Sequence, residues 1–368
     1  MSTINIERIK LARESRGYSQ STLAKEMKSA SQVLLSKIEK GLSNVTDDVF
    51  TELSLILDYP KDFFYKKHDV YPLKHFYFRK NLGMSMTKAR LLESQINILS
   101  GNICDLLDAV EIEIDLPFTD LYKTGLSPEQ MADRVRDYFN LPKGPIKDLI
   151  KVVEQQGVII HFFDFTSDLK ISGVSYITPV GVPVMILNKN MPNSRKVFTI
   201  AHELGHILMH FKGGIISEDR NVENEADRFA SSFLMPSSEI KSSLYYLTDE
   251  KLGDLKRYWK VSIQALLFKA KDTGALTQDQ YRRWVTKISY YGWRKQEPLE
   301  FEISEPKLLY KMLKLHFQDL QYSKNELCEM FGLNEIEFDK IYLQSSSDLQ
   351  DYLNVDSKVR KLKVELDY

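Results

Sequence analysis

The spacing of hydrophobic residues along the first sixty positions predicts four short helices. Gly17 closes the first helix, Ser19 caps the second, and Gly41 stops the third, which runs from about residue 31 to 40. The fourth helix ends before Pro60, whose ring cannot continue a helix. Residues 4–58 are therefore predicted to form a small helical bundle.

The next strong pattern is a long one. Apolar residues recur at steps of three and four from residue 87 to about residue 114, which predicts an amphipathic helix of several turns that Pro117 ends. Its apolar stripe fits either an intramolecular core or the seam of a dimer, because the period is the same in both cases.

From residue 127 onward the pattern mixes two periods. Three short stretches are rich in β-branched residues and bounded by Gly, Pro and Asn, which predicts strands at 158–163, 173–176 and 183–187. Helical spacing predicts helices at 128–139, 145–155, 195–211 and 221–234. Residues 238–368 read as mostly helical. The chain is therefore expected to have an α+β fold that is mostly helical.

The composition is that of an ordinary globular chain. Hydrophobic residues make up 43% and charged residues 27%, which argues against disorder. At about 100–200 residues per domain, 368 residues correspond to two or three domains. No apolar run approaches the ~18 residues of a membrane span, and the N-terminus lacks the apolar block of a signal peptide. Two distant cysteines exclude a disulfide framework and a cysteine-based zinc finger. We expect a cytoplasmic protein with no membrane partner.

The sharpest chemical signal is the stretch His202-Glu203-Leu204-Gly205-His206. Histidines four positions apart share one helix face, so both imidazoles can reach one ion. Glu203 lies about 100° around the helix from His202, close enough to take a proton from a water on that ion. The apolar flanks predict a buried helix, in which two histidines need a reason. This pattern indicates a zinc site of the peptidase kind.

Such a zinc site needs a third protein ligand and an open position for water. The acidic residues downstream are Glu218, Asp219, Glu223, Glu225 and Asp227. We favour Glu223, which lies nearer the centre of the apolar face of its helix, and keep Glu225 as the alternative. Asp227 follows Glu223 by one turn and could hydrogen-bond a ligand histidine. His210 lies ~12 Å along the helix axis from His202, too far for one ion to bridge, and is expected to be structural or to support a ligand.

Residues 20–41 have the layout of a helix-turn-helix. Residues 1–40 carry eight Lys and Arg against four acids, which suggests an anionic partner at this end of a nearly neutral chain. In such a motif the second helix crosses the DNA backbone and the third, capped here by Ser31, enters the major groove. A helical bundle with a merely solvated basic surface is the alternative. The predicted DNA-binding residues are Gln20 and Ser21 at phosphates, with Ser31, Gln32, Val33, Ser36 and Lys37 along the third helix.

These motifs resemble two known families. Residues 5–60 resemble the XRE/Cro-type helix-turn-helix through Gln20, Leu23-Ala24 and residues 36–41. Residues 127–240 resemble the ImmA/IrrE metallopeptidase family, at 171–173, 186–188, 195–206, 223–226, 229–230 and 234–236. The tail is similar to the fused architecture at 259–262 and 292–298. The chain thus resembles an XRE-family regulator fused to an ImmA/IrrE-type peptidase domain.

The resemblance implies roles for particular residues. His202, His206 and Glu223 would bind Zn²⁺, and Glu203 would be the catalytic base. Members of the peptidase family cleave or sense on behalf of a repressor, and several free-standing ones cut an XRE repressor. One departure concerns DNA binding: from Leu23 to Gly41 the chain is one residue longer than usual, and its turn at 28–30 lacks the customary Gly.

A second departure lies on the third helix. Val33 and Leu34 occupy positions where polar readers of bases are common. Their apolar side chains fit contact with thymine methyl groups, and they fit weakened DNA binding equally well.

The expected architecture has four parts. They are an XRE-type helix-turn-helix DNA-binding domain at 1–62, a connector with the long helix at 63–120, a zincin-like metallopeptidase domain with a small β-sheet at 121–240, and a helical C-terminal domain at 241–368.

The expected function is that of a DNA-binding transcriptional regulator that binds a double-stranded operator as a homodimer. Its zinc peptidase domain either senses a small-molecule inducer or a protein partner, or cleaves a repressor, which can be this chain itself. Two alternatives stay open: an antitoxin-like autorepressor of its own operon, and a dedicated zinc endopeptidase in which the helix-turn-helix only targets the substrate.

Overall fold

The chain folds into two compact units, each built from separate stretches of sequence. The computed structural model describes residues 3–71, 77–78, 85–165, 171–211, 220–294 and 296–343. The first unit combines residues 1–75, 82–111 and 308–368, and the second combines residues 76–81 and 112–307. The predicted segment 241–368 is thus shared between the two units. Among the described residues, no helix is both long and apolar enough to cross a membrane.

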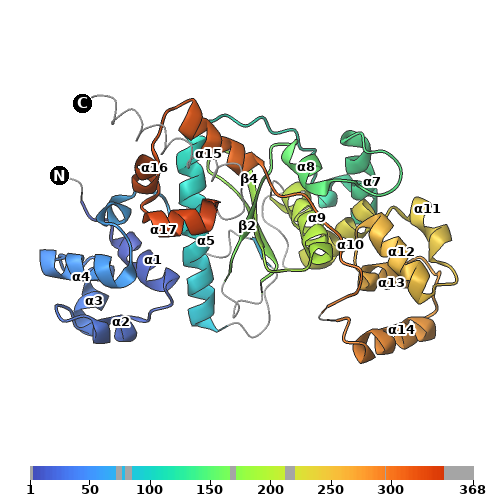
Figure 1. Cartoon of the computed structure of the whole chain (residues 1–368), viewed down its shortest axis with the longest axis horizontal. Coiled ribbons are helices and arrows are strands. Elements are labelled where there is room, and N and C mark those ends of the chain that lie inside the picture. Colours follow the sequence, from blue (N-terminus) through green and yellow to red (C-terminus); the bar gives the residue numbers. More distant parts are fainter. Residues whose placement is uncertain are drawn as a thin grey trace, which may run out of the picture. The chain divides into compact units, whose positions relative to one another are not determined.

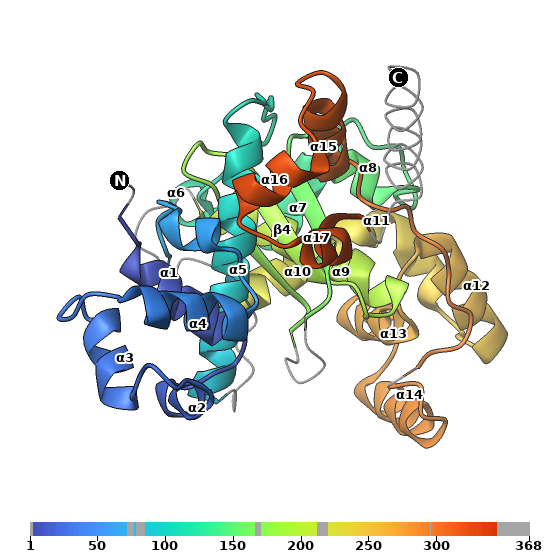
Figure 2. The same ribbon diagram turned by 60° about the vertical axis from the view of Figure 1, so that its left-hand side comes forward.

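The N-terminal helices of the first unit form the predicted bundle. Ser19 caps the second helix through a capping box with Thr22, and Ser31 caps the third by accepting from the N–H of Leu34. Figure 2 shows the four helices together in shades of blue. With the short 3₁₀ helix that follows, they are α1 (Ile6–Ser15), α2 (Gln20–Glu26), α3 (Gln32–Glu39), α4 (Asp47–Leu57) and η1 (Lys61–Tyr65).

The turn between α2 and α3 is held from outside rather than by a glycine. The carboxylate of Glu52, on α4, accepts hydrogen bonds from the N–H of Lys28 and from both the N–H and the hydroxyl of Ser29, at 2.6–3.1 Å. None of residues 28–30, all of which the structure describes, has a positive φ. The turn therefore does not need the conformational freedom of the customary Gly.

The long helix α5 (Met86–Leu107) forms the other half of the first unit's core. Its apolar stripe, including Leu92, Ile96 and Ile103, is fully buried and packs against α1 and the C-terminal helices. The stripe was expected to form either an intramolecular core or the seam of a dimer, and in the described residues it forms an intramolecular core. The C-terminal elements are α15 (Leu308–Gln318), α16 (Lys324–Phe331), α17 (Glu335–Phe338) and the π-helical turn η4 (Asp339–Leu343).

The predicted end of the long helix near residue 114 is wrong, because α5 stops at Leu107. From Val110 to Leu116 apolar residues alternate with acidic ones, a period of two that suits extended chain better than helix. Residues 110–120 are indeed non-helical, and the N–H of Asp115 donates to the carbonyl of Gln156.

The second unit contains a small mixed sheet, in the order β1-β3-β4-β2. β2 runs parallel to β4, whereas β3 is antiparallel to both β4 and β1. The three predicted strands are confirmed, and a two-residue edge strand from the connector adds a fourth. The strands are β1 (Tyr77–Phe78), β2 (Ile159–Phe163), β3 (Gly173–Ile177) and β4 (Pro183–Asn188).

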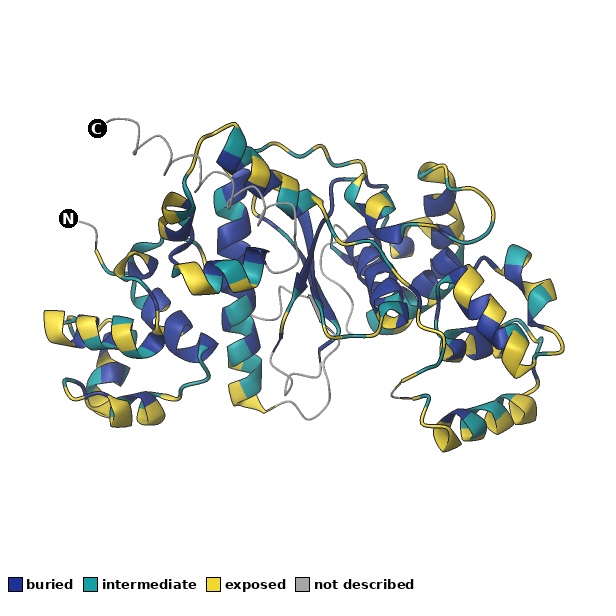
Figure 3. Ribbon diagram, in the orientation of Figure 1, coloured by how far each residue is buried: buried dark blue, intermediate teal, exposed yellow. Residues whose placement is uncertain are grey.

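Helices cover this sheet and make the second unit mostly helical. The helix α9 (Asn193–His210) lies against β3 and β4, and α10 (Val222–Leu234) packs between α9 and α7 (Figure 1). In Figure 3 α9 is largely dark blue, as expected for the predicted buried helix. The remaining helices are α6 (Leu121–Thr124), α7 (Pro128–Tyr138), α8 (Leu149–Glu154), α11 (Ser237–Ile240), η3 (Lys241–Leu244), α12 (Asp249–Trp259), α13 (Ile263–Asp272) and α14 (Gln278–Tyr290).

A buried ion pair ties the loop after α14 to the start of α13. The carboxylate of Glu297 accepts from the N–H groups of Ile263 and Gln264, at 2.8 and 3.2 Å, and from Lys256 Nζ at 3.0 Å. The side chain of Lys256 is 0% exposed. Glu297 thus accepts hydrogen bonds from two N–H groups at the start of α13 that have no partner within the helix. It also neutralises the positive charge of the buried Lys256.

Candidate functional site

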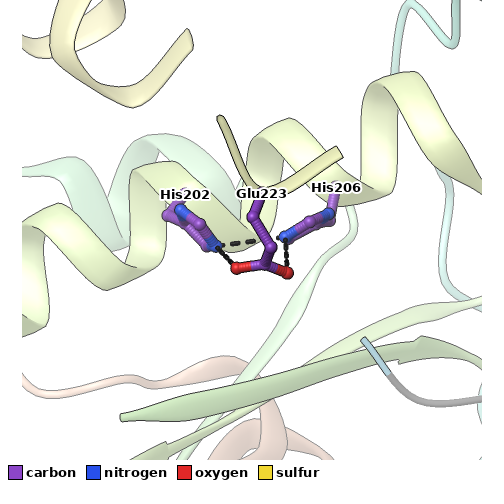
Figure 4. Close-up of side chains that lie close together, drawn as sticks. All are labelled: His202, His206 and Glu223. Atoms are coloured by element: carbon purple, nitrogen blue, oxygen red, sulfur yellow. Dashed lines mark hydrogen bonds and ion pairs between the residues drawn. The ribbon is translucent and has the colours of Figure 1, made fainter. Parts of the chain in front are cut away.

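Two neighbouring helices bring three metal-ligating side chains to one point. His202 and His206 lie one turn apart on α9, with their Nε2 atoms 3.0 Å from each other. Glu223, in the first turn of α10, places Oε2 3.6 Å from His202 Nε2 and Oε1 3.4 Å from His206 Nε2. All three donor atoms lie within 4.8 Å of one another (Figure 4). The three side chains therefore point toward a common centre.

The chemistry of this cluster fits a divalent cation such as Zn²⁺. Two imidazole nitrogens and one carboxylate are a ligand set of catalytic zinc sites. Glu223 Oε2 is screened from solvent and has no hydrogen-bond partner among the described residues, so a cation would supply the interaction that this atom lacks. Glu225 lies outside the cluster, and Glu218 and Asp219 fall outside the described residues.

The electrostatics of the cluster favour positive charge at its centre. Burial disfavours charge on His202, but its interactions with Asp227 and Glu223 outweigh burial and raise its pKa to about 9. Interactions with His202 and His206 in turn hold the pKa of Glu223 far below its usual range. Binding of a cation would require His202 to be deprotonated, because metal ligands bind in their deprotonated form.

Glu203 lies on the same helix and is not one of the cluster's three donors. Its side chain is buried, and Ser175 on β3 donates its hydroxyl hydrogen to Oε2 at 2.5 Å. Burial raises the pKa of Glu203, against the opposing charges of His206 and His202. A carboxylate so oriented, with a raised proton affinity, suits the role of a general base.

Other predicted residues contact the Nδ1 atoms of the two histidines, on the side of each ring away from the cluster. Asp227 Oδ1 lies 2.9 Å from His202 Nδ1, the contact expected one turn after Glu223. His210 Nδ1 lies 2.9 Å from His206 Nδ1, and Glu225 Oε2 lies 3.0 Å from His210 Nε2. Burial and the charge of His206 lower the pKa of His210 to about 4. The structure thus places Glu223 beside the donor nitrogens and Glu225 behind His210.

Close packing of α9 on α10 depends on Gly205. A Cβ atom built at this position would lie 2.9 Å from Phe229 Cδ1 and 3.4 Å from the Cα of Ala226. The absence of a side chain therefore lets α10 approach closely enough for Glu223 to reach the two histidines.

We expect Gly205→Ala to destabilise the second unit by about 1–3 kcal/mol, because an extra methyl group overpacks this contact. Urea unfolding followed by tryptophan fluorescence measures the loss. Arg195→Ala, at an exposed position of the same helix, is the control and should stay within about 0.5 kcal/mol of the parent. A Gly205→Ala protein as stable as that control would contradict the packing argument.

The predicted DNA-contacting residues lie on the surface of the bundle, with one qualification. Ser21, Ser31, Gln32 and Lys37 are exposed, Ser36 is half-buried, and Val33 is 66% exposed. Gln20 is half-buried, and its amide donates to Glu39 Oε2 at 2.7 Å, beside the buried ion pair of Glu39 with Arg13. The side chain of Gln20 therefore helps to fix α2 on α3, in addition to any phosphate contact.

Sequence reasoning missed two functional neighbours. The position of Ser175 could have been predicted, because side chains alternate along a strand and Ser175 therefore lies on the same face as Gly173. This strand, β3, packs against α9. Glu52 could not, because its contact with the turn spans more than twenty residues and no local pattern indicates it.

Comparison with known families agrees with this arrangement. Residues 153–271 match the family described as the IrrE N-terminal-like domain, a peptidase family, and residues 9–64 match the helix-turn-helix family. No curated protein matches the chain at a significant level. The first match contains all three donors of the cluster, and the second contains α2 and α3. This chain therefore carries an XRE-type helix-turn-helix domain and an IrrE/ImmA-like peptidase domain in one polypeptide.

Proposed function

We propose that this chain is a transcriptional regulator that binds operator DNA through α2 and α3 and carries a zinc-dependent peptidase site in its second unit. The observation that carries the peptidase half is the convergence of His202, His206 and Glu223 beside a buried, oriented Glu203. The observation that carries the DNA-binding half is the exposed third helix of a basic helix-turn-helix.

The residues of the site divide the work of peptide hydrolysis. His202, His206 and Glu223 would hold the zinc, which would supply Lewis-acid chemistry that lowers the pKa of a water molecule. Glu203 would take a proton from a water molecule whose oxygen attacks a peptide carbonyl carbon. Glu203 then returns that proton to the amide nitrogen as the carbon–nitrogen bond breaks. Ser175 keeps the carboxylate of Glu203 in place through its hydrogen bond.

We expect the purified protein to bind one zinc per chain, and Glu223→Ala to lose most of that binding, because two histidines alone make an incomplete site. Elemental analysis and titration with a zinc-sensitive dye measure both. Glu129→Ala, which removes a carboxylate that pairs with Arg228 of α10 away from the cluster, is the matched control. Wild-type protein that takes up no zinc even when zinc is added would refute the site.

We also propose that DNA binding occurs as a homodimer on a double-stranded operator, since paired helix-turn-helix units read two half-sites. Lys37→Ala should weaken binding to the upstream region of its own gene and reduce the slope of log affinity against log salt by about 1. Fluorescence anisotropy at several salt concentrations provides the measurement. Lys147→Ala, an exposed lysine of the second unit, is the control. Equal slopes for the two variants would remove Lys37 from the interface.

A second candidate is that the zinc site senses a ligand or partner without cutting a bond. The observation that favours it is the presence of both domains in one chain, because a regulator that cleaved its own DNA-binding part would be consumed at each use. Repression of its own operon in the manner of an antitoxin, and targeting of a separate protein substrate by the helix-turn-helix, remain compatible with the same two domains.

A further inference from the structure

A row of polar side chains begins at His206 and runs away from the cluster formed by His202, His206 and Glu223. His206 Nδ1 lies 2.9 Å from His210 Nδ1, and His210 Nε2 lies 3.0 Å from Glu225 Oε2. Arg220 follows, with its Nε 3.0 Å from both carboxylate oxygens of Glu225 and Nη2 2.9 Å from Oε2. Its Nη1 lies 3.8 Å from Asp120 Oδ1. The side chains of His206 and His210 are 1% and 0% exposed, so the contact between the two imidazoles is shielded from solvent.

We infer that Glu225 and His210 are positioning residues that fix the tautomer of His206, with its proton on Nδ1 and its lone pair on Nε2 toward the cation. This inference rests on the proposed zinc site and assigns a role to residues that do not touch the metal.

The direction of each hydrogen bond follows from the carboxylate end of the row. Glu225, ion-paired with Arg220, only accepts, so His210 Nε2 donates to it. A neutral imidazole carries one N–H, so the other nitrogen of His210 accepts from His206 Nδ1. The Nε2 atom of His206 is then left with a lone pair, as a metal ligand must be.

The metal end of the row leads to the same assignment. A cation on His206 Nε2 requires the ring's proton on Nδ1, and that proton requires an acceptor, which His210 Nδ1 provides only as the Nε2–H tautomer. His202 also has its proton on Nδ1 and its lone pair on Nε2, because its Nδ1 contacts the carboxylate of Asp227 directly. The two ligand histidines are therefore oriented by different devices, one direct and one through a second imidazole.

Removal of the Glu225 carboxylate should weaken zinc binding through His210. In Glu225→Ala, no carboxylate holds the proton of His210 on Nε2, so this proton can move to Nδ1. The N–H groups at Nδ1 of His206 and of His210 would then face each other. Their repulsion would turn the lone pair of His206 away from the cation. Partners of this kind are typically worth 10–100-fold in metal affinity. We therefore expect zinc to bind about 10–100-fold more weakly to Glu225→Ala, whereas the control Glu129→Ala should bind like the wild type.

The decisive measurement is the tautomer itself, in the full-length zinc-loaded protein labelled with ¹⁵N in its histidines. Long-range ¹H–¹⁵N correlation spectra should show His206 protonated at Nδ1 and His210 protonated at Nε2. The opposite tautomer of His210, or a zinc affinity of Glu225→Ala within threefold of the wild type, would overturn the inference. If Glu225→Ala does not fold, the wild-type spectrum still decides. A wild-type protein that binds no zinc would instead refute the proposed function.

Discussion

Glu203→Gln is expected to bind one zinc per chain like the wild type and to lose peptide hydrolysis by about 10²–10⁴-fold, the usual contribution of a positioned general base. The amide keeps the size of the carboxylate and can still accept the hydrogen bond from Ser175, so fold and metal site should persist. It cannot take a proton from water. The loss should therefore appear in turnover and not in zinc content.

The same variant separates the two proposed uses of the site. If the chain regulates by cleavage, Glu203→Gln should keep repression and fail to induce, and immunoblots should show a discrete fragment only in the wild type. If the site is a sensor, the variant should respond to the inducing condition much like the wild type, with no fragment in either protein. A reporter gene behind the operator gives the readout, with Glu129→Gln as the control. Zinc loss in Glu203→Gln would contradict its placement outside the ligand set.

Glu297→Ala is expected to be among the most destabilising single changes in the second unit, at about 3–5 kcal/mol, the usual cost of breaking a buried ion pair from one side. It leaves the fully buried Lys256 without the carboxylate at 3.0 Å and removes the acceptor for the first N–H groups of α13. Residues 296–298 would lose their anchor at the same time.

Urea unfolding measures this effect cleanly, because Trp259, Trp284 and Trp293, the three tryptophans of the chain, all belong to the second unit. Glu300→Ala is the matched control. Its carboxylate also faces Lys256, but at 3.8 Å and with the side chain 41% exposed, and it accepts from the N–H of Ser194 at 3.0 Å. Its loss should therefore cost about 1–2 kcal/mol, less than the loss of Glu297. Equal destabilisation by the two variants would show that Glu297 does not carry the pairing of Lys256.

Short-range signals predicted most of the individual elements. Ser19 and Ser31 cap their helices as expected, since a cap depends only on residues within one turn. The three strands follow from β-branched runs between turn residues, and the pair of histidines on one helix face follows from helical geometry alone. One error, the end of the long helix, arose where a period of two replaced the helical period after Leu107.

What the sequence alone determined is therefore the set of local parts: a capped helix-turn-helix, a buried helix with two histidines and an adjacent glutamate, and three strands. Only the tertiary structure decided how distant parts combine. Residues 308–343 belong to the first unit, where they and α1 bury the stripe of α5. Glu223 and Glu225 differ by about 200° around α10, so the packing of α10 on α9 turns one toward the donor nitrogens and the other toward His210. The physical reason is that long-range contacts depend on how helix faces meet in space, which no local period encodes.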